Sequence, residues 1–237
     1  MTQERLWIPV GAERLAAVLH LPSGPVPVPC VVASHGLAAS KNSDKYLMLA
    51  DSLGQVGLAC CRYDFRGSGE SDGSAAATTV KGRIEDLRAV ITYLRALPII
   101  DADRLGLFGS SFGGFVSHFV VKEEMVSAIV TWATPASLAG MERLKSEGVT
   151  GLGPAFFAEL AERTYIEPPE GVSEILIVHG DQDDLVPVTH AKLLWERARE
   201  PKELLILHGG DHRFSDPILR QQAMDHTVEW FLKHLGH

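Results

Sequence analysis

The 237-residue chain is poor in cysteine, in basic residues and in long apolar runs, and each shortage excludes a class of protein. It has three cysteines, an odd number at no metal-ligand spacing, so we predict neither a disulfide framework nor a metal site. Lys and Arg number 22 against 30 Asp and Glu, and the resulting net charge of -8 argues against a nucleic-acid partner. No segment approaches the roughly 18 consecutive apolar residues of a membrane span.

The first ten residues, MTQERLWIPV, mix acidic and basic side chains and lack the apolar region of a signal peptide, so we expect a cytoplasmic protein. The composition is that of an ordinary globular protein, 46% hydrophobic and 22% charged. The length suits one α/β domain over residues 1–237. Cys30, Cys60 and Cys61 lie in or beside apolar runs and are predicted to be buried free thiols.

The chain alternates short apolar runs with longer amphipathic ones. It opens with a predicted hairpin, residues 5–9 and 15–21 around a turn at Gly11. Six later runs are apolar on both faces, as in a parallel sheet covered on each side. They span residues 30–34, 58–63, 104–108, 127–132, 174–178 and 203–207. Helical periodicity marks residues 80–94 and 224–235, the second helix with Pro217 in its first turn and Asp216 as its cap. We therefore predict a three-layer α/β/α fold with a mostly parallel sheet and an N-terminal hairpin.

Residues 134–172 interrupt this alternation, because no strand is predicted among them. An insertion of this size at one end of a sheet often forms a cap or lid, although ordinary helical packing explains it equally well. Its aromatic residues Phe156 and Phe157, together with His35 after the first parallel strand, are candidate substrate-contacting residues.

The pattern G-x-S-x-G occurs twice, centred on Ser111 and on Ser71. The pattern carries chemical meaning only where a strand turns sharply into a helix and lifts the serine above the sheet edge. Ser111 follows the predicted strand 104–108 and precedes an apolar helical run, whereas Ser71 lies in a polar loop. Ser110 is also adjacent, but its position in the pattern directs it away from the apex. Ser111 is therefore the candidate nucleophile, and the amide of Phe112 is a candidate oxyanion donor.

A serine hydroxyl needs a base to remove its proton and an acid to orient that base. Both are expected in loops after later strands, because open α/β sheets place their chemistry at the carboxyl ends of the strands. One such loop holds Asp181, Asp183 and Asp184, and the next holds His212. The order serine, acid, histidine fits, but the spacing alone does not choose among the three aspartates.

Four segments resemble motifs of the α/β-hydrolase superfamily, in particular its esterases and related serine peptidases. Residues 179–187 resemble the H-G-x-x-D-x-x-V-P signature, which implies that Asp183 is the catalytic acid. Residues 210–212 resemble G-x-H, which implies His212 as the base, and residues 35–37 resemble H-G-x, which implies the amide of Leu37 as the second oxyanion donor. Residues 64–71 resemble the structural turn D-x-x-G-x-G-x-S, which explains the second G-x-S-x-G match.

The resemblance implies a serine hydrolase that cleaves small or medium carboxylic esters, including aromatic ones of the cinnamoyl type, through an acyl-enzyme intermediate. No cofactor and no metal are expected, and the partner is a small-molecule ester. A serine aminopeptidase or acylpeptidase would carry the same motifs. A non-enzymatic hydrolase-fold receptor is the third alternative, although such a protein has little need of a complete triad. A dehalogenase or epoxide hydrolase would need aspartate at position 111. The sequence does not predict an oligomeric state.

Overall fold

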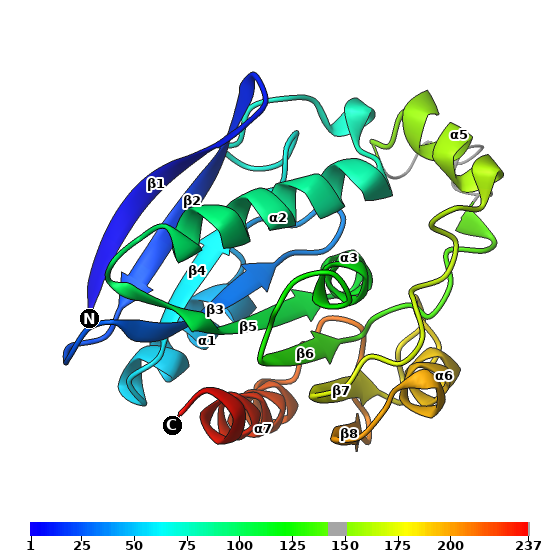
Figure 1. Ribbon diagram of the computed structural model, residues 1–237. Helices are drawn as coiled ribbons and strands as arrows, with labels where there is room; N and C mark the ends of the chain where they lie inside the picture. The colour runs from blue at the N-terminus through cyan, green and yellow to red at the C-terminus, as the bar shows by residue number, and fades with distance from the viewer. Residues whose placement is uncertain (142–150, 237) are drawn as a thin grey trace.

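The computed structural model describes residues 1–141 and 151–236, which form an eight-stranded sheet with helices on both faces (Figure 1). The strands are β1 (Thr2–Val10), β2 (Glu13–Leu21), β3 (Val28–Ser34), β4 (Ala59–Tyr63), β5 (Ile100–Ser110), β6 (Ala128–Trp132), β7 (Ile175–Gly180) and β8 (Lys202–Leu207). The helices are α1 (Asp44–Gln55), α2 (Val80–Arg95), α3 (Phe112–Val121), α5 (Pro154–Glu162), α6 (Thr189–Arg197) and α7 (Pro217–Leu235), with a short 3-10 helix η1 (Ala75–Ala77).

The strand order is β1-β2-β4-β3-β5-β6-β7-β8. The hairpin of β1 and β2 joins antiparallel to β4, and every pair from β4 to β8 is parallel. The predicted three-layer α/β/α fold with an N-terminal hairpin is thereby confirmed.

Alternate residues of the central strands face opposite layers, which explains why these strands are apolar throughout. In β3, Val32 packs with α2 and α3 on one face, whereas Val31 packs with α1 and α7 on the other. In β5, Leu107 and Phe108 divide between the two faces in the same way. The three cysteines lie in these strands and are buried free thiols, as predicted.

The start of one strand differs clearly from its prediction. β5 begins at Ile100, before the predicted start at residue 104, because Ile100 pairs with Val28 beyond a register shift between Val28 and Cys30. Helix α7 begins as expected at Pro217, and the Asp216 carboxylate accepts hydrogen bonds from the amides of Ile218 and Leu219. None of the described helices is long and apolar enough to cross a membrane.

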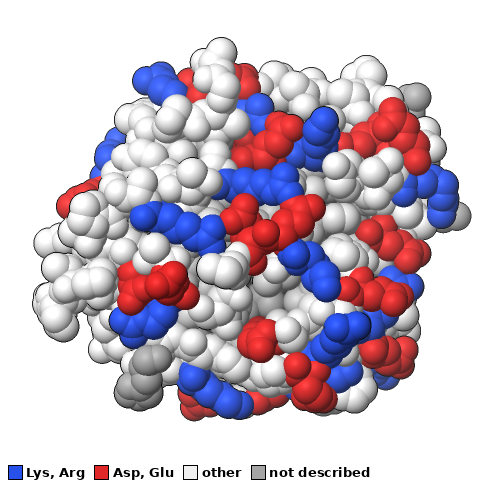
Figure 2. Space-filling model, in the orientation of Figure 1, with Lys and Arg blue, Asp and Glu red and all other residues white. Residues whose placement is uncertain are grey.

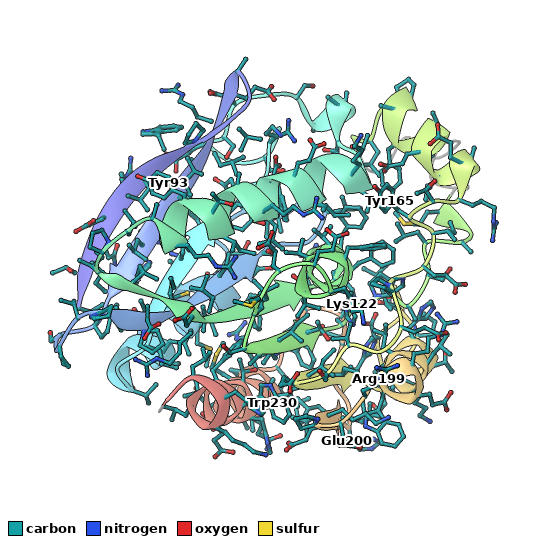
Figure 3. All side chains as sticks on the ribbon, viewed as in Figure 1. Tyr93, Lys122, Tyr165, Arg199, Glu200 and Trp230 are labelled. Carbon is teal, nitrogen blue, oxygen red and sulfur yellow. The ribbon has the colours of Figure 1, made fainter. Side chains whose placement is uncertain are left out.

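Part of the predicted cap, residues 142–150, lies outside the described residues. Within the described part of 134–172, α5 lies beside η1 and the N-terminal end of α2 (Figure 1). Tyr165, labelled in Figure 3, then stacks edge-on against Phe119 of α3 at a centroid distance of 5.4 Å. That this segment acts as a cap stays a prediction.

Candidate active site

Ser111 lies at the sharp turn between β5 and α3. It has φ 54° and ψ −122°, a conformation that costs energy in a residue with a side chain and that collects at functional sites. Its amide donates to the carbonyl of Trp132 at 2.8 Å, which ties the turn to the neighbouring strand β6. The structure therefore places Ser111 at the apex of a strand-to-helix elbow, as the sequence context predicts.

The glycines of the motif are required by close backbone contacts at this elbow. A Cβ atom at Gly109 would lie 2.5 Å from the Cα of Gly114, and one at Gly113 would lie 2.2 Å from the carbonyl oxygen of Ser34. Neither position can hold a side chain unless the backbone moves. The elbow thus packs closely against the end of β3, and this contact helps to position Ser111 at the sheet edge.

Ser111, His212 and Asp183 form a continuous chain of hydrogen bonds. The Oγ of Ser111 lies 3.2 Å from Nε2 of His212, and Nδ1 of His212 lies 2.8 Å from Oδ2 of Asp183. Because an ionised carboxylate only accepts, Nδ1 carries the hydrogen and Nε2 is left to accept from the serine hydroxyl. This is the tautomer that a general base requires.

Asp183 is the buried member of its loop and is held on several sides. Its Oδ1 accepts from the amides of Leu185 at 3.0 Å and Val186 at 2.8 Å, and Nε2 of His179 lies 3.2 Å from Oδ2. Burial alone would raise the pKa of this carboxyl, but hydrogen bonds from His179, His212 and the Val186 amide outweigh it and hold the pKa well below its usual range. Asp183 is therefore ionised at neutral pH.

The neighbouring aspartates have other surroundings. The carboxylate of Asp181 accepts from Nδ1 of His208 at 2.5 Å and from the amide of Gly209 at 2.7 Å, and Asp184 is exposed. Of the three aspartates, Asp183 is the one that the described structure brings to His212.

Phe112 directly follows the candidate nucleophile, and the loop that carries Leu37 lies near it. Phe112 is the first residue of α3, and the first amides of a helix have no partner within the helix. A Cβ atom at Gly36 would lie 3.2 Å from the Cβ of Ser111, so the loop that carries Leu37 passes directly beside the nucleophile. The role of the Leu37 and Phe112 amides stays a prediction, and their placement is compatible with it.

His35 is fully buried, and both of its ring nitrogens are engaged by the backbone. Nδ1 donates to the carbonyl of Gly36 at 2.7 Å, and Nε2 accepts from the amide of Phe65 at 3.1 Å. Burial lowers the pKa of His35 to about 4, which keeps the ring neutral. The ring holds the loop after β3 in place and offers no surface to a substrate, so the expectation of a substrate contact there finds no support in the structure.

Phe156 and Phe157 both lie on α5, but their exposure differs. Phe156 is fully buried and its ring meets that of Phe112 at a centroid distance of 5.9 Å, whereas Phe157 is half-buried. The insertion therefore reaches the residue that follows the nucleophile. Whether either ring contacts a substrate stays a prediction.

The second G-x-S-x-G match is a structural turn. The hydroxyl of Ser71 donates to the carbonyl of Asp64 at 2.6 Å and accepts from the amide of Ala16 at 2.8 Å. Gly69 has φ +53°, and a Cβ atom there would lie 2.1 Å from the Asp64 carboxylate. Ser110 is likewise occupied, since its hydroxyl accepts from Nζ of Lys45 at 3.0 Å. Neither serine hydrogen-bonds to His212 among the contacts of the described residues.

Two residues near the site were not singled out from the sequence. His179 was visible as the first residue of the H-G-x-x-D motif, but its contact with Asp183 was not inferred. Arg83 falls on the apolar face of α2 between Val80 and Ile84, and its guanidinium lies 5.2 Å from the ring centroid of Phe112. The described residues contain no cluster of three or more His, Cys, Asp or Glu side chains that could hold a metal ion.

A profile of the prolyl oligopeptidase family matches residues 48–237. Among curated proteins, the uncharacterized protein YfhR of Escherichia coli K12 is 27% identical over 203 residues, which cover 82% of this chain and 68% of YfhR. The quorum-quenching protein AidA of Acinetobacter baumannii is 33% identical over 102 residues, 43% of this chain and 33% of AidA.

Solved structures share the fold over nearly the whole chain. Est1E from Butyrivibrio proteoclasticus, in a structure with ferulic acid bound, superposes with a TM-score of 0.80 at 18% identity over 98% of this chain and 100% of that one. Mouse alpha/beta hydrolase domain-containing protein 10 gives 0.79 at 20% identity, over 97% of this chain and 99% of that one. Because the family profile spans most of the sequence, the protein belongs to the prolyl oligopeptidase family and is a hydrolase of the α/β-hydrolase fold.

Proposed function

We propose that the protein is a serine hydrolase that cleaves small to medium carboxylic esters through an acyl-enzyme intermediate. The observation that carries the proposal is the chain from Ser111 through His212 to Asp183, at a strained elbow on the carboxyl edge of the sheet. Such a constellation has little structural purpose, because it holds a strained serine conformation next to a buried charge.

In the first half of the reaction, Oγ of Ser111 attacks the ester carbonyl carbon as Nε2 of His212 takes its proton. The negative charge moves to the carbonyl oxygen, where the amides of Leu37 and Phe112 would stabilise it, each by about 3 kcal/mol of barrier. His212 then donates the proton to the leaving alcohol, and the C–O bond to that alcohol breaks. In the second half, water loses a proton to His212 and attacks the acyl carbon, and Ser111 regains its proton as the acid leaves.

The choice of an ester rests on two supporting observations. The solved neighbour Est1E holds ferulic acid, an aromatic carboxylic acid. Here, α5 brings the aromatic side chains of Phe156 and Phe157 toward Phe112, next to the nucleophile. An apolar or aryl acyl group would suit such surroundings.

Cleavage of peptides is the second candidate, because the matching family is named for a peptidase. Parallel assays with 4-nitrophenyl esters of increasing chain length, methyl ferulate and a fluorogenic peptide panel separate the two candidates. Faster turnover of a peptide than of any ester would favour the peptidase and contradict the ester proposal.

The central test is to label the protein with a fluorophosphonate and to map the adduct by mass spectrometry. We expect the adduct on Ser111, no labelling of Ser111→Ala, and full labelling of Ser71→Ala. Ser111→Ala should retain only the small residual rate that binding and the oxyanion hole supply. An adduct on the peptide that carries Ser71, or undiminished labelling of Ser111→Ala, would contradict the proposal.

A further inference from the structure

Arg83 carries a buried positive charge that forms no ion pair among the described residues. The residue is 4% exposed, and its Nε and Nη1 atoms have no hydrogen-bond partner within residues 1–141 and 151–236. Its guanidinium lies over the rings of Phe65, at 4.5 Å from the centroid, and Phe112, at 5.2 Å. Burial lowers its pKa to about 10, so the group still carries its charge at neutral pH.

Contacts with aromatic rings offset only part of the cost of such a charge. A cation over an aromatic ring gains about 0.5–2 kcal/mol, whereas an unpaired buried charge costs several kcal/mol. Buried guanidinium groups are therefore normally paired with a carboxylate or phosphate. The Arg83 guanidinium therefore retains hydrogen-bond donors that could pair with an anion.

Three acids near the start of α2 pair with another residue, although Asp86 also attracts the Arg83 guanidinium at longer range. Asp86 accepts from the amide of Arg66 at 2.9 Å and forms an ion pair with its guanidinium. The same guanidinium lies 3.1 Å from the carboxylate of Glu85 and 3.6 Å from that of Glu13. Arg66 thus forms ion pairs with all three acids. None of the three forms an ion pair with Arg83 among the described contacts.

Arg83 lines a cavity of about 250 Å³ between the start of α2 and the turn of residues 66–74. Besides the acids that Arg66 engages, the cavity wall carries hydrogen-bond donors from Ser74, Thr78, Thr79 and Lys81. The Thr79 hydroxyl accepts from the amide of Gly82 at 2.9 Å, so its own hydrogen is left to donate. The volume lies just below the usual range for drug-sized ligands and suits a small molecule.

The N-terminal amides of α2 are not part of this site, because another side chain already occupies them. The Glu159 carboxylate accepts from the amides of Val80 at 2.5 Å and Lys81 at 2.9 Å. Attraction for an anion in the cavity must therefore come from the side chains of Arg83 and Lys81. No ion pair involves Lys81 within the part of the chain that the structure describes.

We propose that this cavity binds a small oxyanion, a carboxylate or phosphate, with the Arg83 guanidinium as its counter-charge. The site is separate from the ester-cleaving centre and goes beyond the proposed function. Arg83 connects this site to the candidate catalytic centre. Its guanidinium lies over the ring of Phe112, whose amide is a candidate oxyanion donor. A bound anion would restrict the motion of the guanidinium and thereby that of the Phe112 ring.

The test is thermal unfolding of the full chain titrated with sodium acetate, sodium succinate or sodium phosphate, with sodium chloride as the control at equal ionic strength. We expect at least one oxyanion to raise Tm saturably, because a ligand that binds only the folded state stabilises it. A response to phosphate alone or to the carboxylates alone supports the site and identifies which oxyanion it prefers. No saturable rise above the chloride control would overturn the proposal.

Arg83→Met removes the charge but keeps most of the apolar volume, and Arg88→Met removes a positive charge from a half-buried position of the same helix, where Arg88 pairs with Glu123. We expect Arg83→Met to weaken oxyanion binding about 10- to 100-fold and Arg88→Met to leave it unchanged. In oxyanion-free buffer Arg83→Met should be at least as stable as wild type, since an unpaired buried charge is gone. Equal responses in both variants would contradict the proposal.

Should Arg83→Met not fold, Arg83→Lys is the second variant. It keeps the charge without the planar fork of the guanidinium and should show weakened oxyanion binding. Fluorophosphonate labelling reports the catalytic centre independently of these results.

Discussion

Asp183 differs from the two aspartates beside it in its hydrogen bonds and burial, and this difference decides which one can serve His212. The sequence placed three aspartates in the loop, and only resemblance to a family motif chose among them. The structure supplies the physical reason, since two amides and two imidazoles converge on Asp183. Such convergence depends on the path of the loop, which residue spacing does not reveal.

Asp183→Asn tests that assignment. The amide would preserve the shape but would hold His212 in the wrong tautomer, so we expect kcat to fall by roughly four orders of magnitude with the fold intact. Asp181→Asn is the matched control, because Asp181 contacts His208 and Gly209 instead. Turnover of the best ester substrate measures both variants. A greater loss in Asp181→Asn would show that the acid is misassigned.

His179 contacts the same carboxylate oxygen of the candidate catalytic acid, Asp183, as His212 does. Its Nε2 lies 2.8 Å from the carbonyl of Val186 and 3.2 Å from Oδ2 of Asp183. We expect His179→Leu to lower kcat about tenfold or more with little change in KM, because a hydrogen bond to a buried charge is lost. His179→Gln keeps a donor at this position and should recover most of the rate. If His179→Gln is no better than His179→Leu although both variants fold, His179 does not act through its hydrogen bond.

At the scale of elements, α5 is attached to the main domain at three points. Glu159 accepts from the first amides of α2, Phe156 packs on Phe112, and a Cβ atom at Gly153 would lie 2.0 Å from the carbonyl oxygen of Ala76 in η1. The sequence predicted the insertion from its lack of strands but not these contacts, because their partners are remote in the chain. Periodicity within the helix cannot show that a carboxylate caps a different helix.

Glu159→Ala should loosen α5 on its support. The loss of a carboxylate cap from α2 costs about 1 kcal/mol by analogy with N-cap substitutions. We therefore expect a lower free energy of unfolding and faster proteolysis of the segment that carries α5. Glu162→Ala, at an exposed position of the same helix, is the control. Equal proteolysis of the two variants would show that Glu159 does not hold the helix.

For the whole molecule, the sheet was the most predictable part, because each central strand is short and apolar on both faces. The side chains at its surface gave less information. On the face shown in Figure 2, acidic and basic side chains are interspersed, so charge marks no single binding surface there. Arg83 escaped notice for a related reason. Its helical position indicates burial, but only the folded structure shows that its guanidinium lies over Phe65 and that Arg66 pairs with Asp86.

Stability of the whole chain should fall in mild acid because of buried neutral histidines. Burial lowers the pKa of both His35 and His118 to about 4, from an ordinary value of 6.5. Between these two pH values the unfolded chain binds protons that the folded chain excludes, so stability is lost as pH falls from 6.5 to 4 and then levels off. Each residue contributes on the order of 3 kcal/mol to this loss. Burial raises the pKa of Asp86 and Glu159, and these two carboxyls act in the opposite sense.

The contribution of His118 to this acid sensitivity can be measured separately, by comparing the stability of wild type with that of His118→Gln. His118 is buried in α3, where its Nδ1 donates to the carbonyl of Gly114 at 2.9 Å, a bond that a glutamine amide can replace. The variant cannot take up a proton in the unfolded state at this position. Its free energy of unfolding, measured with urea at pH 7.5 and at pH 4.5, should therefore drop less than that of wild type, by a few kcal/mol. Most of this difference should develop below pH 6.5, since above it histidine is largely neutral in both states. Parallel loss of stability in the two proteins would mean that His118 becomes protonated without unfolding, and that its burial does not contribute to acid sensitivity.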